Sequence, residues 1–157
     1  MQSFTPSKLV WTEADFEEMS WHDCRLHGIG LIDDFDPHSH ELCLDIDYIL
    51  QWRRAAAGDE CDGFWISPAT LVFTPESFHI HFAGLSGSWI ISIDRGAMIS
   101  DCYEWLVRLN TGGSITISAP GYRQYLRRAP VFIAAPDQSL ETSQRGAISF
   151  DTSTYHA

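Results

Sequence analysis

Apolar and polar residues alternate along most of the chain after residue 20, which predicts β-strands rather than helices. The alternation is clear in segments 22–33 and 41–52, which are separated by the turn-forming stretch Phe35-Asp36-Pro37-His38-Ser39. We therefore expect these segments to form an antiparallel hairpin with Asp33 opposite Glu41. The pairing gives an apolar face, expected to be buried, that includes Leu26, Leu44, Ile46 and Tyr48, and a polar face that includes Arg25, His27, Asp45 and Asp47.

Two glycines interrupt the first strand of this hairpin. Gly28 and Gly30 fall on its apolar face, where they would leave room for the bulky side chains of the partner strand. The alternative is a bulge or a bend at one of the two glycines.

A second group of strands follows residue 63. Segments 64–73 and 78–82 alternate around the turn Thr74-Pro75-Glu76-Ser77, and segment 89–93 continues the pattern, which predicts a three-stranded meander.

Residues 100–110 fit two structures. Asp101 and Glu104 have capping-box spacing, which favours a helix. In a strand, a loop at 110–112 would instead align Trp105 with Ile117 and Val107 with Ile115, and we prefer the strand.

The two ends of the chain differ from its middle. Thr12-Glu13-Ala14-Asp15 predicts a short helix that ends before Ser20, and segment 121–128 predicts a short element that Pro130 stops. Beyond residue 135 the chain is poor in core residues, apart from a short strand expected at 147–150. We expect an all-β fold, a predominantly antiparallel sandwich or rolled sheet of about seven strands with a short N-terminal helix. Residues 1–135 would form a single β domain and residues 136–157 a weakly ordered tail.

The charge of the chain is strongly negative and unevenly distributed. The formal net charge is −11, and residues 1–62 hold fourteen acidic and four basic residues, a net charge of −10. This sign opposes binding to nucleic acid and to anionic membrane surfaces. The N-terminus resembles no secretory signal and no apolar run reaches membrane-spanning length, so we expect a cytoplasmic protein with four free cysteines.

The tripeptide Trp21-His22-Asp23 is the first candidate for chemistry. Neighbouring strand residues point to opposite faces, so His22 and Asp23 would not share one ion. Strand parity instead places His22 in the core opposite Trp52, where we expect the tripeptide to be a structural motif at the junction of helix and strand.

Two further pairs have spacings known from catalytic and metal sites. His79 and His81 would lie about 7 Å apart on one strand face, but their expected neighbours supply no third ligand, so they are weak metal candidates. Asp45 and Asp47 align two carboxylates, as a glycosidase or a hard-cation site needs, yet Arg25 and His27 offer them cross-strand salt bridges. We assign no catalytic residue, metal or cofactor from these patterns.

Several segments together resemble a family of small, uncharacterised bacterial proteins. The resemblance spans roughly residues 20 to 130 and is carried by Ser20-Trp21-His22-Asp23, residues 41–52 (ELCLDIDYILQW), residues 68–73 (PATLVF) and the Gly121-Tyr122-x-Gln124-Tyr125-x-Arg127 pattern. The resemblance implies that the chain shares the fold of this family, but it implies no particular activity. More loosely, an aromatic-His-Asp sequence near the start of an all-β domain is similar to one family of immunity proteins in bacterial toxin systems.

Three functions remain open at this point. The leading hypothesis is a non-enzymatic, immunity-like binding protein whose acidic first hairpin faces a basic protein, through Asp33, Asp34, Asp36, Asp45 and Asp47. The second is a metal- or carboxylate-dependent hydrolase that uses Asp45, Asp47, His79 and His81. The third is a carrier that holds a small ligand in its aromatic-rich interior.

Overall fold

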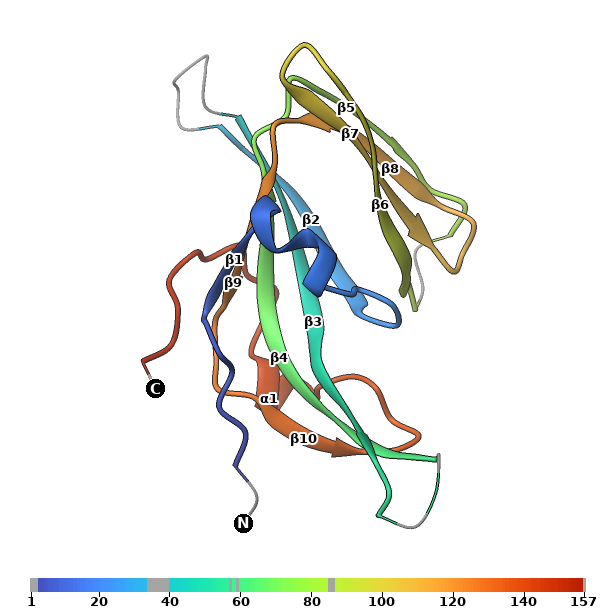
Figure 1. Cartoon of the computed structure of the whole chain (residues 1–157), viewed down its shortest axis with the longest axis vertical. Helices are drawn as coiled ribbons and strands as arrows, with labels where there is room; N and C mark the ends of the chain where they lie inside the picture. The colour runs from blue at the N-terminus through green and yellow to red at the C-terminus, as the bar shows by residue number, and fades with distance from the viewer. Residues whose placement is uncertain (1–2, 34–39, 57, 59, 85–86, 157) are drawn as a thin grey trace.

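Two antiparallel β-sheets build the fold in a computed structural model that describes residues 3–33, 40–56, 58, 60–84 and 87–156 (Figure 1). Ten strands form them: β1 (Val10–Thr12), β2 (Arg25–Asp33), β3 (His40–Arg54), β4 (Cys61–Phe73), β5 (Ser77–His81), β6 (Ile90–Ile99), β7 (Cys102–Leu109), β8 (Ser114–Ala119), β9 (Tyr122–Leu126) and β10 (Val131–Ala134). The six-stranded sheet has the order β1-β9-β4-β3-β2, and β10 also pairs with β4. The four-stranded sheet has the order β5-β8-β7-β6. The predicted all-β antiparallel sandwich is confirmed, with ten strands instead of about seven.

The core lies between the two sheets. Leu44 and Ile46 of β3 are fully buried and Tyr48 nearly so, which confirms the predicted apolar face of the first hairpin. Opposite them, the four-stranded sheet contributes the fully buried Trp105, around which the rings of Phe73 and Tyr122 pack with centroids 5.8 and 5.4 Å away. Aromatic rings thus fill the space between the sheets, as the composition suggests.

The register of the first hairpin differs from the prediction. Asp33 pairs with His40 instead of Glu41, and the register shifts again between Leu26 and Gly28, where His27 is the extra residue of a bulge. Because each shift of one residue exchanges the two faces of a strand, Gly28 and Gly30 lie on the outer face of the sheet. The expectation that the glycines make room inside the core is wrong. A bulge does form, as in the alternative, but its extra residue is His27, next to Gly28, and not a glycine.

The predicted three-stranded meander is also wrong. The segment 74–76 does not close a hairpin but carries the chain from one sheet to the other, so β5 pairs with β8 and β6 pairs with β7. Both sides of β4 are already occupied, by β3 on one side and by β9 and β10 on the other. Alternation identifies strands but does not name their partners.

The strand preferred for residues 100–110 is confirmed as β7. Trp105 pairs with Ile117 and Val107 with Ile115, as predicted from the three-residue loop. Gly112 in this loop has a φ of 85°, a conformation that glycine adopts without strain.

The short N-terminal helix is confirmed as the 3-10 helix η1 (Glu13–Glu18). The Asp15 carboxylate accepts a hydrogen bond of 2.9 Å from the Thr12 amide at its start. Phe16 packs edge-on against Trp105, and Arg95 of β6 donates to Glu13 at 2.6 Å, so η1 closes one side of the sandwich. The described residues form one further helix, the four-residue α1 (Thr142–Arg145). Neither of these two helices is long enough to cross a membrane.

The C-terminal segment, for which the sequence predicts weak order, lies against the outer face of the six-stranded sheet. Leu140 and Arg145 are buried there, and Asp151 accepts a hydrogen bond of 2.7 Å from Thr70 of β4 through its backbone oxygen. The strand expected at 147–150 does not form, because the Ser149 amide donates to a side chain, Asp45, rather than to a neighbouring strand. Polar contacts contribute to holding this segment, and they leave no trace in the pattern of apolar residues.

Candidate functional site

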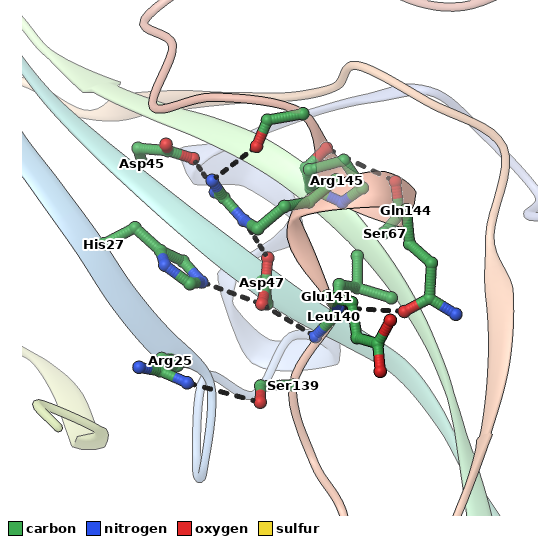
Figure 2. Close-up of polar contacts among 12 residues, drawn as sticks. Arg25, His27, Asp45, Asp47, Ser67, Ser139, Leu140, Glu141, Gln144 and Arg145 are labelled. Atoms are coloured by element: carbon green, nitrogen blue, oxygen red, sulfur yellow. Dashed lines mark hydrogen bonds and ion pairs between the residues drawn. The ribbon is translucent and has the colours of Figure 1, made fainter.

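A buried cluster of charged side chains lies between the outer face of the six-stranded sheet and the C-terminal segment. Asp45 and Asp47, two residues apart on β3, both point to this face as predicted, and both are fully buried. Figure 2 shows Asp47 between His27 of β2 and Arg145 of α1, and Asp45 at the tip of the Arg145 side chain. We call Asp45, Asp47, Arg127, Arg145 and His27 the charged cluster.

Asp45 is held by two arginines. Arg145 donates from Nη2 to Asp45 Oδ1 at 2.7 Å, and Arg127, which directly follows β9, donates to the same oxygen from its own Nη2. The second carboxylate oxygen, Oδ2, accepts a hydrogen bond of 3.0 Å from the Ser149 amide. Arg127 is fixed in turn by a bond of 2.7 Å from its Nη1 to the Thr70 hydroxyl. Every polar atom of the Asp45 carboxylate is therefore engaged.

Asp47 has a different set of partners. Arg145 donates from Nε to Asp47 Oδ1 at 3.0 Å, and Oδ2 contacts His27 Nε2 at 2.8 Å and the Leu140 amide at 3.1 Å. Burial by itself would raise the pKa of Asp47, but the His27 contact, the Arg145 guanidinium and the Leu140 amide outweigh it and lower that pKa. Asp47 is thus a carboxylate whose charge the surrounding donors stabilise.

The cluster is close to electrically neutral. Two carboxylates face two guanidinium groups, and the four side chains are at most 7% exposed. Buried charges of this kind are tolerated when each is paired and hydrogen-bonded, and losing one partner is costly. A carboxylate that accepts bonds at both oxygens is unsuited to act as a nucleophile or a general base while those bonds persist. The arrangement therefore fastens the C-terminal segment to the sheet.

The two glycines of β2 provide a second contact for the same segment. A Cβ atom on Gly30 would lie 2.7 Å from the Phe150 ring, and one on Gly28 would lie 2.9 Å from Ile148 Cγ2. Both distances are shorter than side-chain carbons tolerate, so the absence of a side chain is what lets Phe150 and Ile148 approach the sheet.

An open polar pocket of about 960 Å³ borders the charged cluster. Its walls come from α1 and the residues around it, together with Arg25 and His27 of β2. Arg25 contacts the Ser139 hydroxyl at 3.4 Å (Figure 2) and lies 5.8 Å from the centre of the Trp89 ring. No group of three or more His, Cys, Asp or Glu side chains suited to a metal occurs among the described residues.

The structure separates the other predicted site residues. His79 and His81 are exposed on β5, in the four-stranded sheet, away from Asp45 and Asp47 on the six-stranded one. Asp33 is exposed at the end of β2, where its carboxylate lies 3.6 Å from His40, while Asp34 and Asp36 lie outside the described residues. The four side chains of the hydrolase hypothesis thus do not share a cleft.

The tripeptide Trp21-His22-Asp23 forms a turn before β2 rather than part of the strand. His22 lies beside Trp52, with ring centroids 6.3 Å apart, but it is exposed and not buried as predicted. Its Nδ1 lies 3.1 Å from the Asp23 carboxylate. The strand parity argument fails here because Asp23 has a φ of 64° and the strand begins at Arg25. Trp21 is the buried member, and it donates from Nε1 to Gln124 Oε1 at 2.7 Å.

Sequence reasoning missed Arg127, Arg145 and Thr70 as members of the site. Arg145 is one hundred positions from Asp45, in a segment with few apolar residues, and its role follows from no local pattern. The sequence does contain one signal. Glycines within a strand, here Gly28 and Gly30, indicate a sheet face against which another segment of the chain packs closely.

Comparisons with protein-family models, with curated proteins and with solved structures find no match for this chain.

Proposed function

We propose that this protein is a non-enzymatic binding protein whose partner is a basic protein. The observation that carries the proposal is where the charge lies. Asp45 and Asp47 are neutralised internally by Arg127 and Arg145, so the whole formal charge of −11 is borne by the remaining side chains. A net charge of this size attracts a basic protein over a distance of about a Debye length, roughly 8 to 10 Å at physiological salt.

The arrangement of the candidate catalytic groups also favours binding over catalysis. Both carboxylates of the charged cluster are covered and fully engaged, and His79 and His81 lie on the other sheet. An immunity-like role in the bacterial cytoplasm, in which an acidic protein neutralises a basic toxin, is the form of binding that the resemblance of Trp21-His22-Asp23 suggests.

The test begins with capture of partners by the tagged full chain from its host's lysate at about 50 mM salt, where surface charges are weakly screened. Association rates of a captured protein are then measured across a salt series. We expect a partner with an excess of Lys and Arg, whose association slows several-fold as salt rises.

Two triple variants separate a local from a general effect of charge. The first variant changes three residues of the first hairpin to Asn: Asp33, Asp34 and Asp36. The matched control changes three exposed acidic residues in or next to the four-stranded sheet to their amides: Glu76, Asp101 and Glu104. If the first hairpin faces the partner, the first variant slows association more than the second. Capture of no basic protein, or rates that neither salt nor the variants change, would contradict the proposal.

A further inference from the structure

The core of the sandwich is closed on one side and open on the other. On the closed side, η1 packs between β1 and β6. On the open side β2 and β5, the terminal strands of their sheets, border a cleft of about 390 Å³ lined by residues 26–29, Ile80, Phe82 and Ser88. We call this the β2–β5 cleft.

Apolar side chains that point into the sandwich are exposed along β2 and β5, Phe82 in the cleft itself and Leu31 and Phe78 further along the two strands. Leu31 pairs with the buried Leu42 and therefore faces inward, yet it is 56% exposed. Phe78 pairs with the buried Ile117 and is 39% exposed, and Phe82 just beyond β5 is 46% exposed. Large inward-facing residues from two strands are thus left uncovered by the described chain, and exposed apolar groups of this kind mark interaction sites.

Beyond the bulge at His27, the edges of the two strands that border the cleft carry no charged residue and no proline until Asp33. Residues 28–32 (GIGLI) and 77–81 (SFHIH) contain no Lys, Arg, Asp, Glu or Pro, the residues that usually discourage a further strand from pairing. Among the described residues, β2 pairs with β3 and β5 pairs with β8. Residues 88–90 also cover the first part of the β2 edge, through a bridge between Arg25 and Trp89 and a bond from the Leu26 amide to Ser88. The edge of β5 and the edge of β2 beyond residue 27 can therefore accept an added strand.

We infer that the β2–β5 cleft binds an extended segment of a basic protein, which adds a strand to the edge of β2 or β5 and inserts alternate apolar side chains against Leu31, Phe78 and Phe82. This inference rests on the proposed function and names the place where the partner binds. A strand fits because edge hydrogen-bonding groups and apolar pockets occur together there.

The net charge of the chain indicates whether the cleft binds a second copy of this protein or a segment of another protein. Two copies would each bring a formal charge of −11 to the interface, which opposes self-association, whereas a basic segment is attracted. In a strand of alternating residues, apolar side chains face the cleft and Lys or Arg side chains point outward, where the net negative charge of the chain attracts them.

Three synthetic peptides of about eight residues, a typical strand length, test the inference on the full chain at low ionic strength. One alternates Val and Lys, a second alternates Ser and Lys, and the third alternates Val and Glu. Binding is measured by titration, and amide hydrogen exchange locates it. We expect the Val-Lys peptide to bind at least about tenfold more tightly than the Ser-Lys peptide and to slow exchange in residues 28–33 or 77–81, with no binding of the Val-Glu peptide.

Two matched variants locate the contact on the protein. Leu31→Gln should weaken binding of the Val-Lys peptide several-fold, whereas Met98→Gln, at a similarly exposed residue near the end of β6, should leave it unchanged. Both residues are more than half exposed, so neither change threatens the fold.

The outcomes separate the two proposals. Equal binding of the Val-Lys and Ser-Lys peptides, without slowed exchange at β2 or β5, would overturn the cleft and leave electrostatic binding of a basic partner intact. No binding of either basic peptide would overturn both. A free protein that sediments as a dimer and becomes monomeric in Leu31→Gln would show a second copy in the cleft and would also overturn the inference.

Discussion

Replacing Arg145 by methionine removes the side chain that joins both carboxylates of the charged cluster. Its guanidinium bonds to Asp45 at 2.7 Å and to Asp47 at 3.0 Å, and the arginine side chain is 5% exposed. Asp45 keeps Arg127 as a cationic partner, but Asp47 keeps His27 and an amide. The cluster then holds two carboxylates and one guanidinium, an uncompensated negative charge in a buried position.

Breaking a buried ion pair by removing one partner costs about 3 to 5 kcal/mol. For a chain of this length, we expect Arg145→Met to lower Tm by about 6 to 20 °C. The loss has an upper limit, because the C-terminal segment can detach and let water reach the carboxylates. Detachment would accelerate hydrogen exchange of the Leu140 and Ser149 amides, both of which donate to the cluster.

Thermal unfolding and amide exchange are measured on Arg145→Met and on the control Arg108→Met. Arg108 lies 3.7 Å from Asp94, and both side chains are more than half exposed, so this pair contributes less than about 1 kcal/mol. Equal Tm values for the two variants, or unchanged exchange of the Leu140 and Ser149 amides in Arg145→Met, would refute the assignment of Arg145 as the fastening residue.

Three further outcomes are expected. Gly30→Ala should lower the unfolding free energy, measured in urea, by about 1 to 3 kcal/mol, because its Cβ would lie 2.7 Å from the Phe150 ring. Most of this loss should vanish in a Phe150→Ala background. Gly58→Ala serves as the control, because its Cβ would lie 4.0 Å from the nearest atom. The pKa of Asp47 is lower in the folded than in the unfolded protein, so its contribution to stability is complete above the unfolded pKa of about 4 and is lost as pH falls through the folded pKa. The unfolding free energy should therefore change less between neutral and acidic pH in Asp47→Asn than in the wild type. Leu44→Ala should cost about 2 to 5 kcal/mol in the same unfolding assay, because Leu44 is fully buried, and a smaller cost than that of Gly58→Ala would contradict its place in the core.

Features that depend on neighbouring residues could be predicted from the sequence. The alternation around Leu44 and Ile46 identifies the buried face of β3, because side chains along a strand alternate between its faces. The pairing of Trp105 with Ile117 follows from a three-residue loop, because the length of a tight loop determines the register of the strands that it joins.

Features that depend on distant segments could not be predicted. β4 pairs with β9 and β10 rather than with β5, and nothing local to β4 distinguishes these partners. In the first hairpin, the loop is long and the bulge at His27 shifts the register, so the pattern left two alternatives for Gly28 and Gly30.

The candidate site likewise has features that depend on neighbouring residues and features that depend on distant segments. The shared face of Asp45 and Asp47 follows from their spacing. The contact of His27 with Asp47 is also predicted, but from a register that the hairpin does not have, since Arg25 pairs with Asp47 and His27 contacts it from the bulge. The burial of both carboxylates depends on Arg145, which arrives from the C-terminal segment. Apolar patterning predicts where a chain buries hydrocarbon, and it does not reveal a segment that is held by charges.

The buried cluster also changes how the acidic surface acts. Fourteen acidic residues of segment 1–62, less Asp45 and Asp47, leave twelve against four basic ones, so the charge that this segment presents outside the cluster is −8 rather than −10. Other exposed acidic residues, such as Glu76 and Glu104, lie on the four-stranded sheet, so negative charge surrounds the molecule instead of marking one face. A field of this kind speeds the approach of a basic partner but gives it little orientation. In the complex that we propose, orientation would come from apolar contacts along β2 and β5, such as those of Leu31. Salt should then act mainly on the association rate and Leu31→Gln mainly on the dissociation rate.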